Sequence, residues 1–370
     1  MRILHVSKYY YPYMGGVENI CKYIVDASTG HKVAVVCFNE GKNDCEDEVD
    51  GVKVYRVGAW VTVARQALSL SYFTVLRKAI REFQPDVIQF HWANPFPAAV
   101  LLCVIPKNVK LIIHWHMDII KQAKIYPLIK PVETALLRRA DRVVVTSPQY
   151  RDGSKPLQPF KEKVRVVPNA FNKEMLDKVL ANDRSEEIKA RYGGKKIVFF
   201  IGRHIQYKGL PYLLEAEKYV KEECVFVIAG SGPLTEELKA SCRSERVKFV
   251  GRLSDEELAL HHQAASVFAF PSITKNEAFG VALAEAMYCN TPAVTFTIEG
   301  SGVNWVNLNG VTGIEVANKD VVAYAKAVDT ILGDEALARR YAEVAHQRAV
   351  ENFTIQKMME KMDEVYKEIE

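Results

Sequence analysis

The sequence predicts an α/β protein made of two doubly wound parallel-sheet domains in tandem. Short β-branched runs alternate with helix-forming stretches over residues 1–168, which is typical of parallel sheets covered by helices. A polar stretch at 169–195 interrupts this alternation, and the same alternation restarts at residue 196. Because 370 residues exceed the size at which a single core usually stops growing, two domains are expected.

The N-terminal domain, 1–168, is expected to be Rossmann-like, with alternating strands and helices. Its strands are predicted at 2–6, 32–38, 52–57, 86–90, 110–115, 142–146 and 164–167. Its helices are predicted at 17–28, 70–83, 94–104, 127–139 and 147–153. Residues 169–195 are interpreted as the interdomain connection.

The C-terminal domain, 196–350, repeats the pattern. Its strands are predicted at 196–201, 225–229, 247–250, 267–270 and 293–295. Its helices are predicted at 209–221, 233–242, 255–264, 280–289, 319–332 and 334–350. The segment 351–370 has apolar residues at helical spacing and is expected to pack back on the domains as a helix. Two such sheets would face each other across a cleft, where their carboxyl edges bind ligand.

Composition narrows the class of protein. Apolar residues at 49% and charged residues at 25% are ordinary for a globular protein, and the longest apolar run, 98–105, is too short to span a bilayer. The N-terminus lacks a signal-peptide pattern and the seven cysteines show no C-x-x-C, so a cytoplasmic location is expected. We see no metal-ligand spacing, and therefore predict no metal site and no cofactor.

Charge is distributed unevenly along the chain. Residues 1–170 contain 24 Lys and Arg against 15 Asp and Glu, whereas residues 171–370 contain 25 against 30. The basic residues of the first half include Lys121, Lys124, Lys130, Arg138, Arg139 and Arg142. An anionic membrane surface or a phosphorylated acceptor would match this excess. No motif supports nucleic acid as a partner.

Two glutamates eight residues apart are the most informative residues of the second half. Glu285 lies in an apolar helical stretch that begins at Gly280, and an unpaired buried carboxylate is costly. No lysine or arginine lies between Lys275 and Lys319, so a pair of ligand hydroxyls could be its partner. Glu277 precedes the same helix, where backbone N–H groups favour anions. The alternative is that Glu277 only starts the helix and Glu285 pairs with a distant cation.

Several loops are suited to phosphate. Arg203 and Lys208 follow the first strand of the second domain, and a guanidinium with an ammonium suits a diphosphate. Gly15 and Gly16 open a helix after the first strand of the chain, where backbone can approach a ligand, although a plain turn is equally compatible. Four further residues end strands and could place backbone against a nucleotide, or could simply form turns: Gly230, Gly232, Arg252 and Leu253.

Histidines end two neighbouring strands of the first domain. The segment His114-Trp115-His116-Met117-Asp118 ends one strand, and His91 ends the strand before it. A histidine at this edge could touch a reacting sugar or line an acceptor pocket. Structural histidines in strands are the more frequent case.

Gly15-Gly16, His116, Arg203 with Lys208, Gly230 with Gly232, and Glu277 with Glu285 occur in the order of the family 4 glycosyltransferase motifs. The chain therefore resembles that family, whose members are retaining nucleotide-sugar enzymes of the GT-B fold. The resemblance spans nearly the whole chain. Individual segments are similar to those of bacterial transferases that build surface polysaccharides. The chain departs from the family at Glu299-Gly300-Ser301-Gly302, where many relatives have Gly-Gly-x-x-Glu. Sugar or base contacts at that segment are therefore not expected to follow the family.

The resemblance implies a role for each matching residue. Arg203 and Lys208 would neutralise the diphosphate, Glu277 would bind sugar hydroxyls and Glu285 the ribose hydroxyls. His116 would lie beside the donor sugar, chosen over His114 because it precedes Asp118 in the family's His-x-Asp order. The catalytic set would be His116, Arg203, Lys208 and Glu277. The remaining donor-binding residues would be Gly15, Gly16, Gly230, Gly232, Arg252, Leu253, Ala278, Phe279, Gly280 and Glu285.

The expected function is transfer of a hexose, from GDP-mannose or a UDP-hexose, to a glycan or lipid-linked acceptor with retained anomeric configuration. The expected location is the cytoplasm, with peripheral attachment to the inner face of the membrane. Two alternatives stay open: a non-hydrolysing nucleotide-sugar epimerase on the same architecture, and a non-catalytic nucleotide-sugar binding protein.

Overall fold

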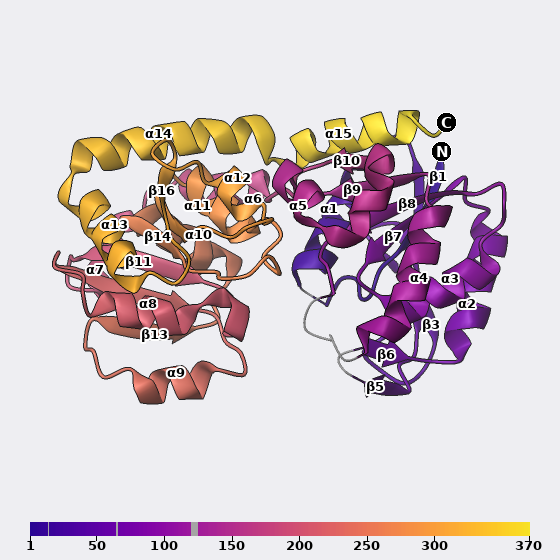
Figure 1. The fold of residues 1–370 in the computed structure, drawn as a ribbon, viewed down its shortest axis with the longest axis horizontal. Coiled ribbons are helices and arrows are strands. Elements are labelled where there is room, and N and C mark those ends of the chain that lie inside the picture. The colour runs from indigo at the N-terminus through magenta and orange to yellow at the C-terminus, as the bar shows by residue number, and fades with distance from the viewer. Residues whose placement is uncertain (14, 64–65, 120–124) are drawn as a thin grey trace. The chain divides into compact units, whose positions relative to one another are not determined.

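The chain folds into two compact α/β units. The structure, a computed structural model, describes residues 1–13, 15–63, 66–119 and 125–370 (Figure 1). The first unit comprises Met1–Pro168 together with Met358–Glu370, and the second comprises Asn169–Lys357. Two basic residues of the first half, Lys121 and Lys124, lie outside the described residues.

The first unit is built on an eight-stranded sheet in the order β10-β9-β8-β7-β1-β2-β4-β3. Its strands are β1 (Arg2–Val6), β2 (Lys32–Phe38), β3 (Cys45–Val49), β4 (Val52–Val57), β7 (Val87–Trp92), β8 (Lys110–Trp115), β9 (Arg142–Val145) and β10 (Val164–Val166). All neighbours pair in parallel except β3, which pairs antiparallel with β4 at the edge. The central strands are buried along nearly their whole length, as expected for a parallel sheet covered on both faces.

Helices cover both faces of this sheet, and one of them comes from the far end of the chain. They are α1 (Gly16–Ala27), α2 (Ser71–Phe83), α3 (Pro95–Val104), α4 (Tyr126–Arg139), α5 (Pro148–Gly153) and α15 (Ile355–Lys367). A 3-10 helix, η1 (Lys155–Lys163), follows α5, and β5 (Val61–Val63) with β6 (Gln66–Leu68) forms a separate two-stranded ribbon. Neither β3 nor this ribbon was predicted, because β3 is exposed and acidic and the ribbon strands have three residues each.

The second unit is built on a six-stranded, fully parallel sheet in the order β13-β12-β11-β14-β15-β16. Its strands are β11 (Lys196–Ile201), β12 (Cys224–Ala229), β13 (Val247–Gly251), β14 (Val267–Phe270), β15 (Ala293–Phe296) and β16 (Gly313–Val316). The order reverses direction at β11, so the loops after β11 and β14 diverge to opposite faces. Such a switch point is where ligands bind in open α/β sheets.

Helices again cover both faces of the second sheet. They are α6 (Lys173–Leu180), α7 (Ser185–Arg191), α8 (Leu210–Glu217), α9 (Thr235–Ser241), α10 (Asp255–Ala264), α11 (Val281–Tyr288), α12 (Val303–Val306), α13 (Val321–Gly333) and α14 (Glu335–Asn352), with the 3-10 turn η2 (Gln206–Lys208) before α8. Two apolar clusters, one on each face, fill the space between the sheet and these helices. Strand β16 and the short helix α12 were not predicted: β16 contains a glycine and a glutamate and buries only its glycine, and α12 is a single turn with two buried residues.

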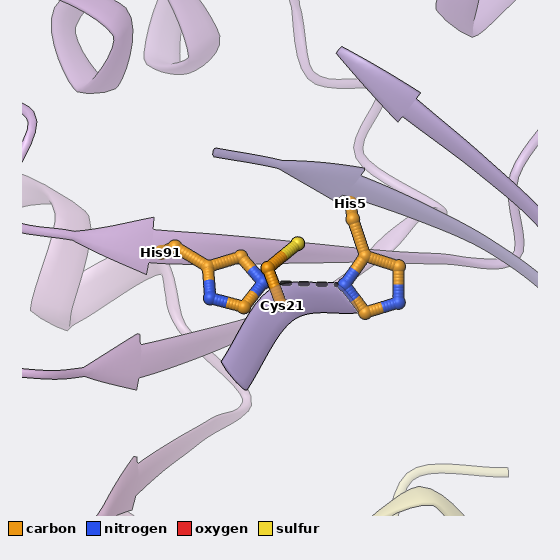
Figure 2. Close-up of side chains that lie close together, drawn as sticks. All are labelled: His5, Cys21 and His91. Carbon is orange, nitrogen blue, oxygen red and sulfur yellow. Dashed lines mark hydrogen bonds between the residues drawn. The ribbon is translucent and has the colours of Figure 1, made fainter. Parts of the chain in front are cut away.

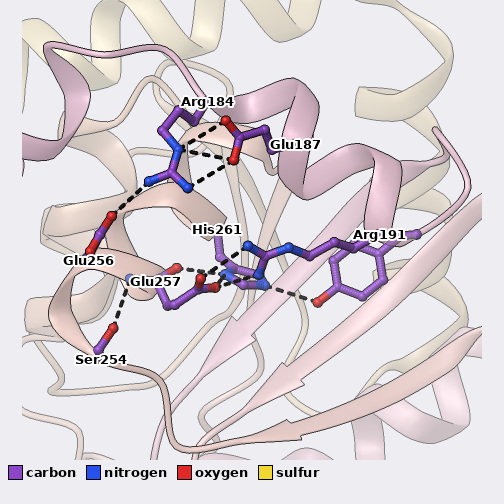
Figure 3. A network of polar contacts seen from close by, with 8 residues as sticks. Arg184, Glu187, Arg191, Ser254, Glu256, Glu257 and His261 are labelled. Carbon is purple, nitrogen blue, oxygen red and sulfur yellow. Dashed lines mark hydrogen bonds and ion pairs between the residues drawn. The ribbon is translucent and has the colours of Figure 1, made fainter.

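The segment 169–195 is not a free connection but part of the second unit. Its helices α6 and α7 bury Leu176 and Ile188 in the same apolar cluster as strand β11. Polar contacts fasten α7 to α10: Arg191 Nη1 lies 2.8 Å from Glu257 Oε2 (Figure 3). Helix α7 was not predicted because its sequence is rich in charged residues. Only one of its seven residues, Ile188, is a buried apolar side chain.

The same network continues around Arg184 and His261. The Arg184 guanidinium contacts both Glu187 within α7 and Glu256 at the start of α10 (Figure 3). The Tyr192 hydroxyl lies 3.0 Å from Nε2 of His261. These mostly exposed pairs contribute little each, so the buried apolar residues hold the segment and the ion pairs orient it.

The C-terminal helix α15 belongs to the first unit. Its apolar face, with Met358, Met362 and Tyr366, is buried, and the Tyr366 hydroxyl donates to Oε1 of Gln89 at 2.5 Å. Hydrogen bonds from Arg165 and Arg142 lower the pKa of Glu368 to about 2. The predicted 351–370 segment is thus divided: residues up to Lys357 belong to the second unit, and the rest to the first.

Among the residues that the structure describes, no helix combines the length and the apolar content needed to cross a bilayer.

Candidate active site

Closely packed loops form the carboxyl edge of the second sheet. Gly230, directly after β12, has φ +105, and a Cβ there would lie 2.0 Å from the carbonyl oxygen of Gly202 after β11. A Cβ on Gly232 would lie 2.5 Å from the carbonyl oxygen of His204. The backbone N–H of His204 donates to the Ser231 carbonyl at 3.1 Å, which ties the two loops together. These glycines therefore have a packing role, and their predicted contact with a nucleotide stays a prediction.

Lys208 and Glu277 form an ion pair in this edge. Lys208 Nζ lies 2.5 Å from Glu277 Oε2, and only 13% and 11% of the two side chains are exposed. The Ser272 hydroxyl donates to the same carboxylate oxygen at 3.1 Å, and Lys208 Nζ lies 5.1 Å from the ring centroid of Phe270. Burial lowers the pKa of Lys208, but the negative charge of Glu277 outweighs this effect and raises it. Lys208 is therefore a fixed positive charge that also orients Glu277.

The sequence patterns placed Lys208 and Glu277 in separate roles and did not predict their contact. They also missed Ser272, which follows β14 in an ordinary turn sequence. The pattern Phe270-Pro271-Ser272 contained no signal beyond a strand end, because the contact depends on the course of the loop that joins Ser272 to Glu277.

The backbone between Glu277 and helix α11 is held from a neighbouring loop. The Ser301 hydroxyl donates to the Glu277 carbonyl oxygen, and the Gly302 N–H donates to the Ala278 carbonyl at 3.0 Å. Gly280 has φ +91, and a Cβ there would lie 2.9 Å from Cζ of Phe270. Ala278 and Phe279 are buried. The segment 299–302, which departs from the family pattern, thus supports this loop through Ser301 and Gly302.

Glu285 is the fifth residue of α11, just over one turn from its start, and is half-buried. Burial, with a smaller contribution from the charge of Asp255, raises its pKa to about 7. In the part of the chain that the structure describes, no ion pair or hydrogen bond engages its carboxylate. The alternative that Glu285 pairs with a distant cation is therefore wrong for the described residues.

Two arginines lie at the rim of the same edge. The Arg203 side chain is exposed, and no described residue pairs with its guanidinium. Arg252 is also exposed, and its Nε donates to the Ser231 hydroxyl at 3.0 Å. Leu253 packs against the apolar cluster that contains Phe279. The second unit therefore brings together the predicted cations and both glutamates at one sheet edge.

In the first unit, Gly15 and Gly16 begin helix α1 as predicted. A Cβ on Gly15 would lie 2.3 Å from Oε2 of Glu18, whose pKa is raised by burial. Nothing lies within 4 Å of a Cβ placed on Gly16. The glycine at position 15 is therefore needed to let the Glu18 carboxylate fold back over the start of the helix.

His116 lies at the end of β8 and is 5% exposed. Its Nε2 lies 2.9 Å from Nδ1 of His91, and its ring stacks on His114 with centroids 4.3 Å apart. Burial, and the proximity of His114, hold the pKa of His116 well below its ordinary value. The three histidines considered separately from the sequence thus form one buried cluster.

Comparison with known proteins identifies the class. The family described as Glycosyltransferase Family 4 matches residues 14–174, and the family described as Glycosyl transferases group 1 matches residues 181–348. D-rhamnosyltransferase WbpZ of Pseudomonas aeruginosa is 30% identical over 334 residues, covering 89% of this chain and 86% of the relative. The chain belongs to glycosyltransferase family 4 and is a glycosyltransferase.

Further relatives agree with this class. O-antigen chain mannosyltransferase C of Escherichia coli is 28% identical over 375 residues, covering 99% of this chain and 98% of the relative. Anabaena Alr3699/HepE, solved in complex with UDP and glucose, superimposes with a TM-score of 0.79 at 18% identity, covering 100% of both chains. Sucrose-phosphate synthase from Thermosynechococcus elongatus gives a TM-score of 0.77 at 21% identity, covering 100% of this chain and 98% of that one. The predicted fold class, GT-B with two Rossmann-like units, is confirmed.

Substitution of Gly230 tests its packing role. We expect Gly230→Ala to lower the free energy of unfolding by about 3 kcal/mol, because both its φ and the Gly202 carbonyl oppose a side chain. Gly194→Ala is the matched control: its φ is +71 but nothing lies within 4 Å, so a cost of about 1 kcal/mol is expected. Urea unfolding followed by circular dichroism measures both, and equal costs would contradict the packing role.

The pKa of Glu285 predicts a pH-dependent stability. Because the folded pKa of about 7 exceeds the ordinary value of 4.5, ionisation of this carboxyl opposes folding above pH 4.5, and fully so above pH 7. We expect Glu285→Gln to raise the free energy of unfolding by about 2 kcal/mol at pH 8. The gain should shrink as pH falls from 7 and vanish below about 4.5.

Urea unfolding of Glu285→Gln and wild type between pH 4 and pH 8 checks this. Glu237→Gln, an exposed position on α9, is the control and should show no such trend. A gain at pH 8 that persists unchanged at pH 4 would mean that the benefit of glutamine does not arise from carboxylate ionisation.

Proposed function

We propose that this glycosyltransferase moves a hexose from a nucleoside-diphosphate sugar to a hydroxyl of a glycan or lipid-linked acceptor, with retained anomeric configuration. The main support is the edge of the second sheet, where Lys208 and Glu277 form an ion pair. Arg203, in the same loop as Lys208, and Glu285, on helix α11, have no partners among the described residues. Cations with unused donors suit a diphosphate, and carboxylates suit sugar hydroxyls.

Each residue has a role in this proposal. Arg203 and the donors of Lys208 not used by Glu277 bind the diphosphate, and the first N–H groups of α11 add to this attraction. Glu277, oriented by Lys208 and Ser272 through Oε2, offers Oε1 to hydroxyls of the transferred sugar. Glu285 accepts from the ribose hydroxyls, which supplies the partner that its buried carboxylate lacks.

The chemical step we propose is a front-face displacement. The acceptor oxygen attacks the anomeric carbon from the face on which the diphosphate leaves, and a new C–O bond forms there. The bond between the anomeric carbon and the phosphate oxygen breaks with its electron pair going to the diphosphate. The acceptor proton passes to a diphosphate oxygen, so the products are the glycoside and the nucleoside diphosphate. Stabilisation of the leaving group by Arg203 and Lys208 is the largest catalytic contribution, and the reaction needs no metal or cofactor.

The sugar and the acceptor are proposed from the named relatives. O-antigen chain mannosyltransferase C and D-rhamnosyltransferase WbpZ support a mannose-type sugar, and therefore GDP-mannose before a UDP-hexose. The name of O-antigen chain mannosyltransferase C also supports a surface-polysaccharide acceptor. The first unit would bind that acceptor, and Gly16, with open space beside it, would allow its close approach.

The cations of the second unit provide the direct test. Arg203→Ala with Lys208→Ala should slow nucleoside-diphosphate release in single-turnover reactions at least about 100-fold, because each lost charge-assisted hydrogen bond costs about 1.5–3 kcal/mol. The reactions contain GDP-mannose or UDP-glucose with a surface-polysaccharide extract. Lys221→Ala, an exposed cation before β12 at the opposite sheet edge, is the control and should leave the rate unchanged.

Because Lys208→Ala leaves Glu277 without its cation, the double variant is accompanied by Arg203→Ala alone, whose side chain is exposed. Full activity of a folded Arg203→Ala protein would contradict the proposed diphosphate site. Proton NMR of the wild-type reaction reads the anomeric configuration directly. An isomerised sugar formed from donor alone would indicate an epimerase, and donor binding without turnover a binding protein.

We further propose that the first unit attaches peripherally to anionic membranes. Support comes from the basic excess of residues 1–170 and from helix α4, on which Leu128 is 80% exposed and Lys130 and Arg138 are also exposed. Arg139 and Arg142 contribute less, because they contact Asp141 and Glu368. Exposed apolar and cationic side chains on one helix are typical of an interfacial surface.

Co-sedimentation with vesicles tests the attachment. Binding to phosphatidylglycerol-containing vesicles should exceed binding to pure phosphatidylcholine and should fall as salt increases. Leu128→Ser should weaken it several-fold, whereas Leu70→Ser, which removes another exposed leucine at the start of α2, should not. Equal binding to both kinds of vesicle would rule out the anionic surface.

A further inference from the structure

Four of the nine histidines form one buried cluster in the first unit. His5 lies on β1, His91 on β7 and His114 on β8, and His116 directly follows β8; their exposed fractions are 0%, 1%, 0% and 5%. His91 pairs with His114 in the strand register, and residues two apart on β8 share one face of the sheet. The resemblance to the family implies a role only for His116, beside the donor sugar, and none for His5 or His91.

Three of these rings form a continuous hydrogen-bonded chain. Nδ1 of His5 lies 3.2 Å from Nε2 of His91, and Nδ1 of His91 lies 2.9 Å from Nε2 of His116. Figure 2 shows the first of these contacts, with the Cys21 side chain of α1 beside it. Both ring nitrogens of His91 are therefore engaged, and the nitrogen of His116 that His91 does not engage is Nδ1.

The rings are neutral. Burial lowers the pKa of His5 and of His114 to about 3, and holds the pKa of His91 well below its ordinary value. A neutral imidazole has one N–H and one lone pair. Each of the three hydrogen-bonded rings must therefore donate through one nitrogen and accept through the other. Both hydrogen bonds then run in the same direction, either from His5 toward His116 or from His116 toward His5.

The end of the chain at His5 decides that direction. Nε2 of His5 is buried and has no hydrogen-bond partner among the described residues. If protons lay on the Nε2 atoms of the chain, this atom would be a buried N–H without an acceptor, which is rarer and costlier in proteins than an unused lone pair. Protons on the three Nδ1 atoms leave only a lone pair there. His5 then donates to His91, and His91 donates to His116.

A metal ion fits this cluster poorly. Three nitrogens of His91, His114 and His116 lie within 4.8 Å of one another, as metal ligands would. However, the rings of His114 and His116 are stacked with centroids 4.3 Å apart and planes that differ by 5°, so one ion cannot lie in the planes of both rings. Nε2 of His116 is also already engaged, since it is hydrogen-bonded to Nδ1 of His91. Burial also raises the pKa of the Cys21 thiol well above its ordinary value, which keeps this neighbour of His5 and His91 protonated and a weak ligand.

We propose that His5 and His91 hold His116 in the tautomer with its proton on Nδ1, so that His116 presents a hydrogen-bond donor to its ligand. His91 is then a positioning residue, and His5 sets its direction. This rests on the proposed function for one point only, that the ligand of His116 is the donor sugar. An Nδ1–H beside that sugar donates to a hydroxyl oxygen and does not accept from it, which restricts the sugar orientations that His116 stabilises.

Nitrogen-15 NMR of the histidine-labelled full-length protein tests the tautomer without substrate. The His116 signals, assigned by their loss in His116→Asn, should show a protonated Nδ1 and an unprotonated Nε2 in the wild type. A protonated Nε2 on His116 in the wild type would overturn the proposal, and this measurement requires no folded variant at position 91.

Two matched variants separate hydrogen bonding from packing. His91→Phe keeps a flat ring but cannot donate, so His116 should lose its single tautomer and give signals of both. His114→Phe changes the ring stacked on His116 but not the hydrogen bond, so the Nδ1–H tautomer should persist. An unchanged tautomer in folded His91→Phe would overturn the role of His91.

Kinetics connect the tautomer to the reaction. With GDP-mannose, His91→Phe should lower kcat about fivefold with little change in KM, as loss of one aligned hydrogen bond predicts, while His114→Phe should not. A shifted tautomer with unchanged kcat would overturn the donor role of His116. Failure of the proposed function itself is distinguished from this, because it would abolish donor turnover in the wild type and leave the NMR result intact.

Discussion

The ion pair between Lys208 and Glu277 is the interaction on which the second unit's sheet edge depends. Two opposite charges with little exposed surface must be satisfied together, since removal of either leaves the other charge desolvated. Such a pair adds little net stability compared with apolar residues, so stability alone does not account for its presence in an otherwise well-packed unit. The loops after β11 and β14 must both keep their courses to maintain the contact.

Much of the surrounding structure holds the loops after β11 and β14 in place. Gly230 and Gly232 let the loop after β12 lie directly on the loop after β11. Ser301 and Gly302 hold the backbone that follows Glu277, from a segment where the sequence departs from the family pattern. A diphosphate arriving at this edge would meet charges that are already fixed, which reduces the reorganisation needed during reaction.

The first unit uses neutral groups where the second uses charges. Its sheet edge contains stacked, uncharged imidazoles and a carboxylate at Glu18 whose pKa is raised by burial. A neutral, directional edge suits the hydroxyl groups of sugars, whereas the cationic edge of the second unit suits phosphates. This contrast is a physical basis for dividing the proposed donor and acceptor tasks between two units of similar topology.

The sequence by itself determined the two alternating α/β patterns, the break near residue 168 and the order of motifs that indicates the family, because these depend on local periodicity and spacing. It also determined that Glu285 would lack a local cation, since none occurs near it in the chain. It did not reveal that 169–195 folds as part of the second unit. Helices with so few apolar residues have the composition of a linker, and their packing is recognised only when the sheet and helices they contact are known. The contact of Lys208 with Glu277, the support from Ser272 and the hydrogen bonds from His5 through His91 to His116 became visible only in the folded molecule. Lys208 and Glu277, like the three histidines, are far apart in sequence, and their contacts follow from strand order and loop packing. Ser272 lies five residues from Glu277, but their contact depends on the course of an irregular loop, which no local pattern encodes.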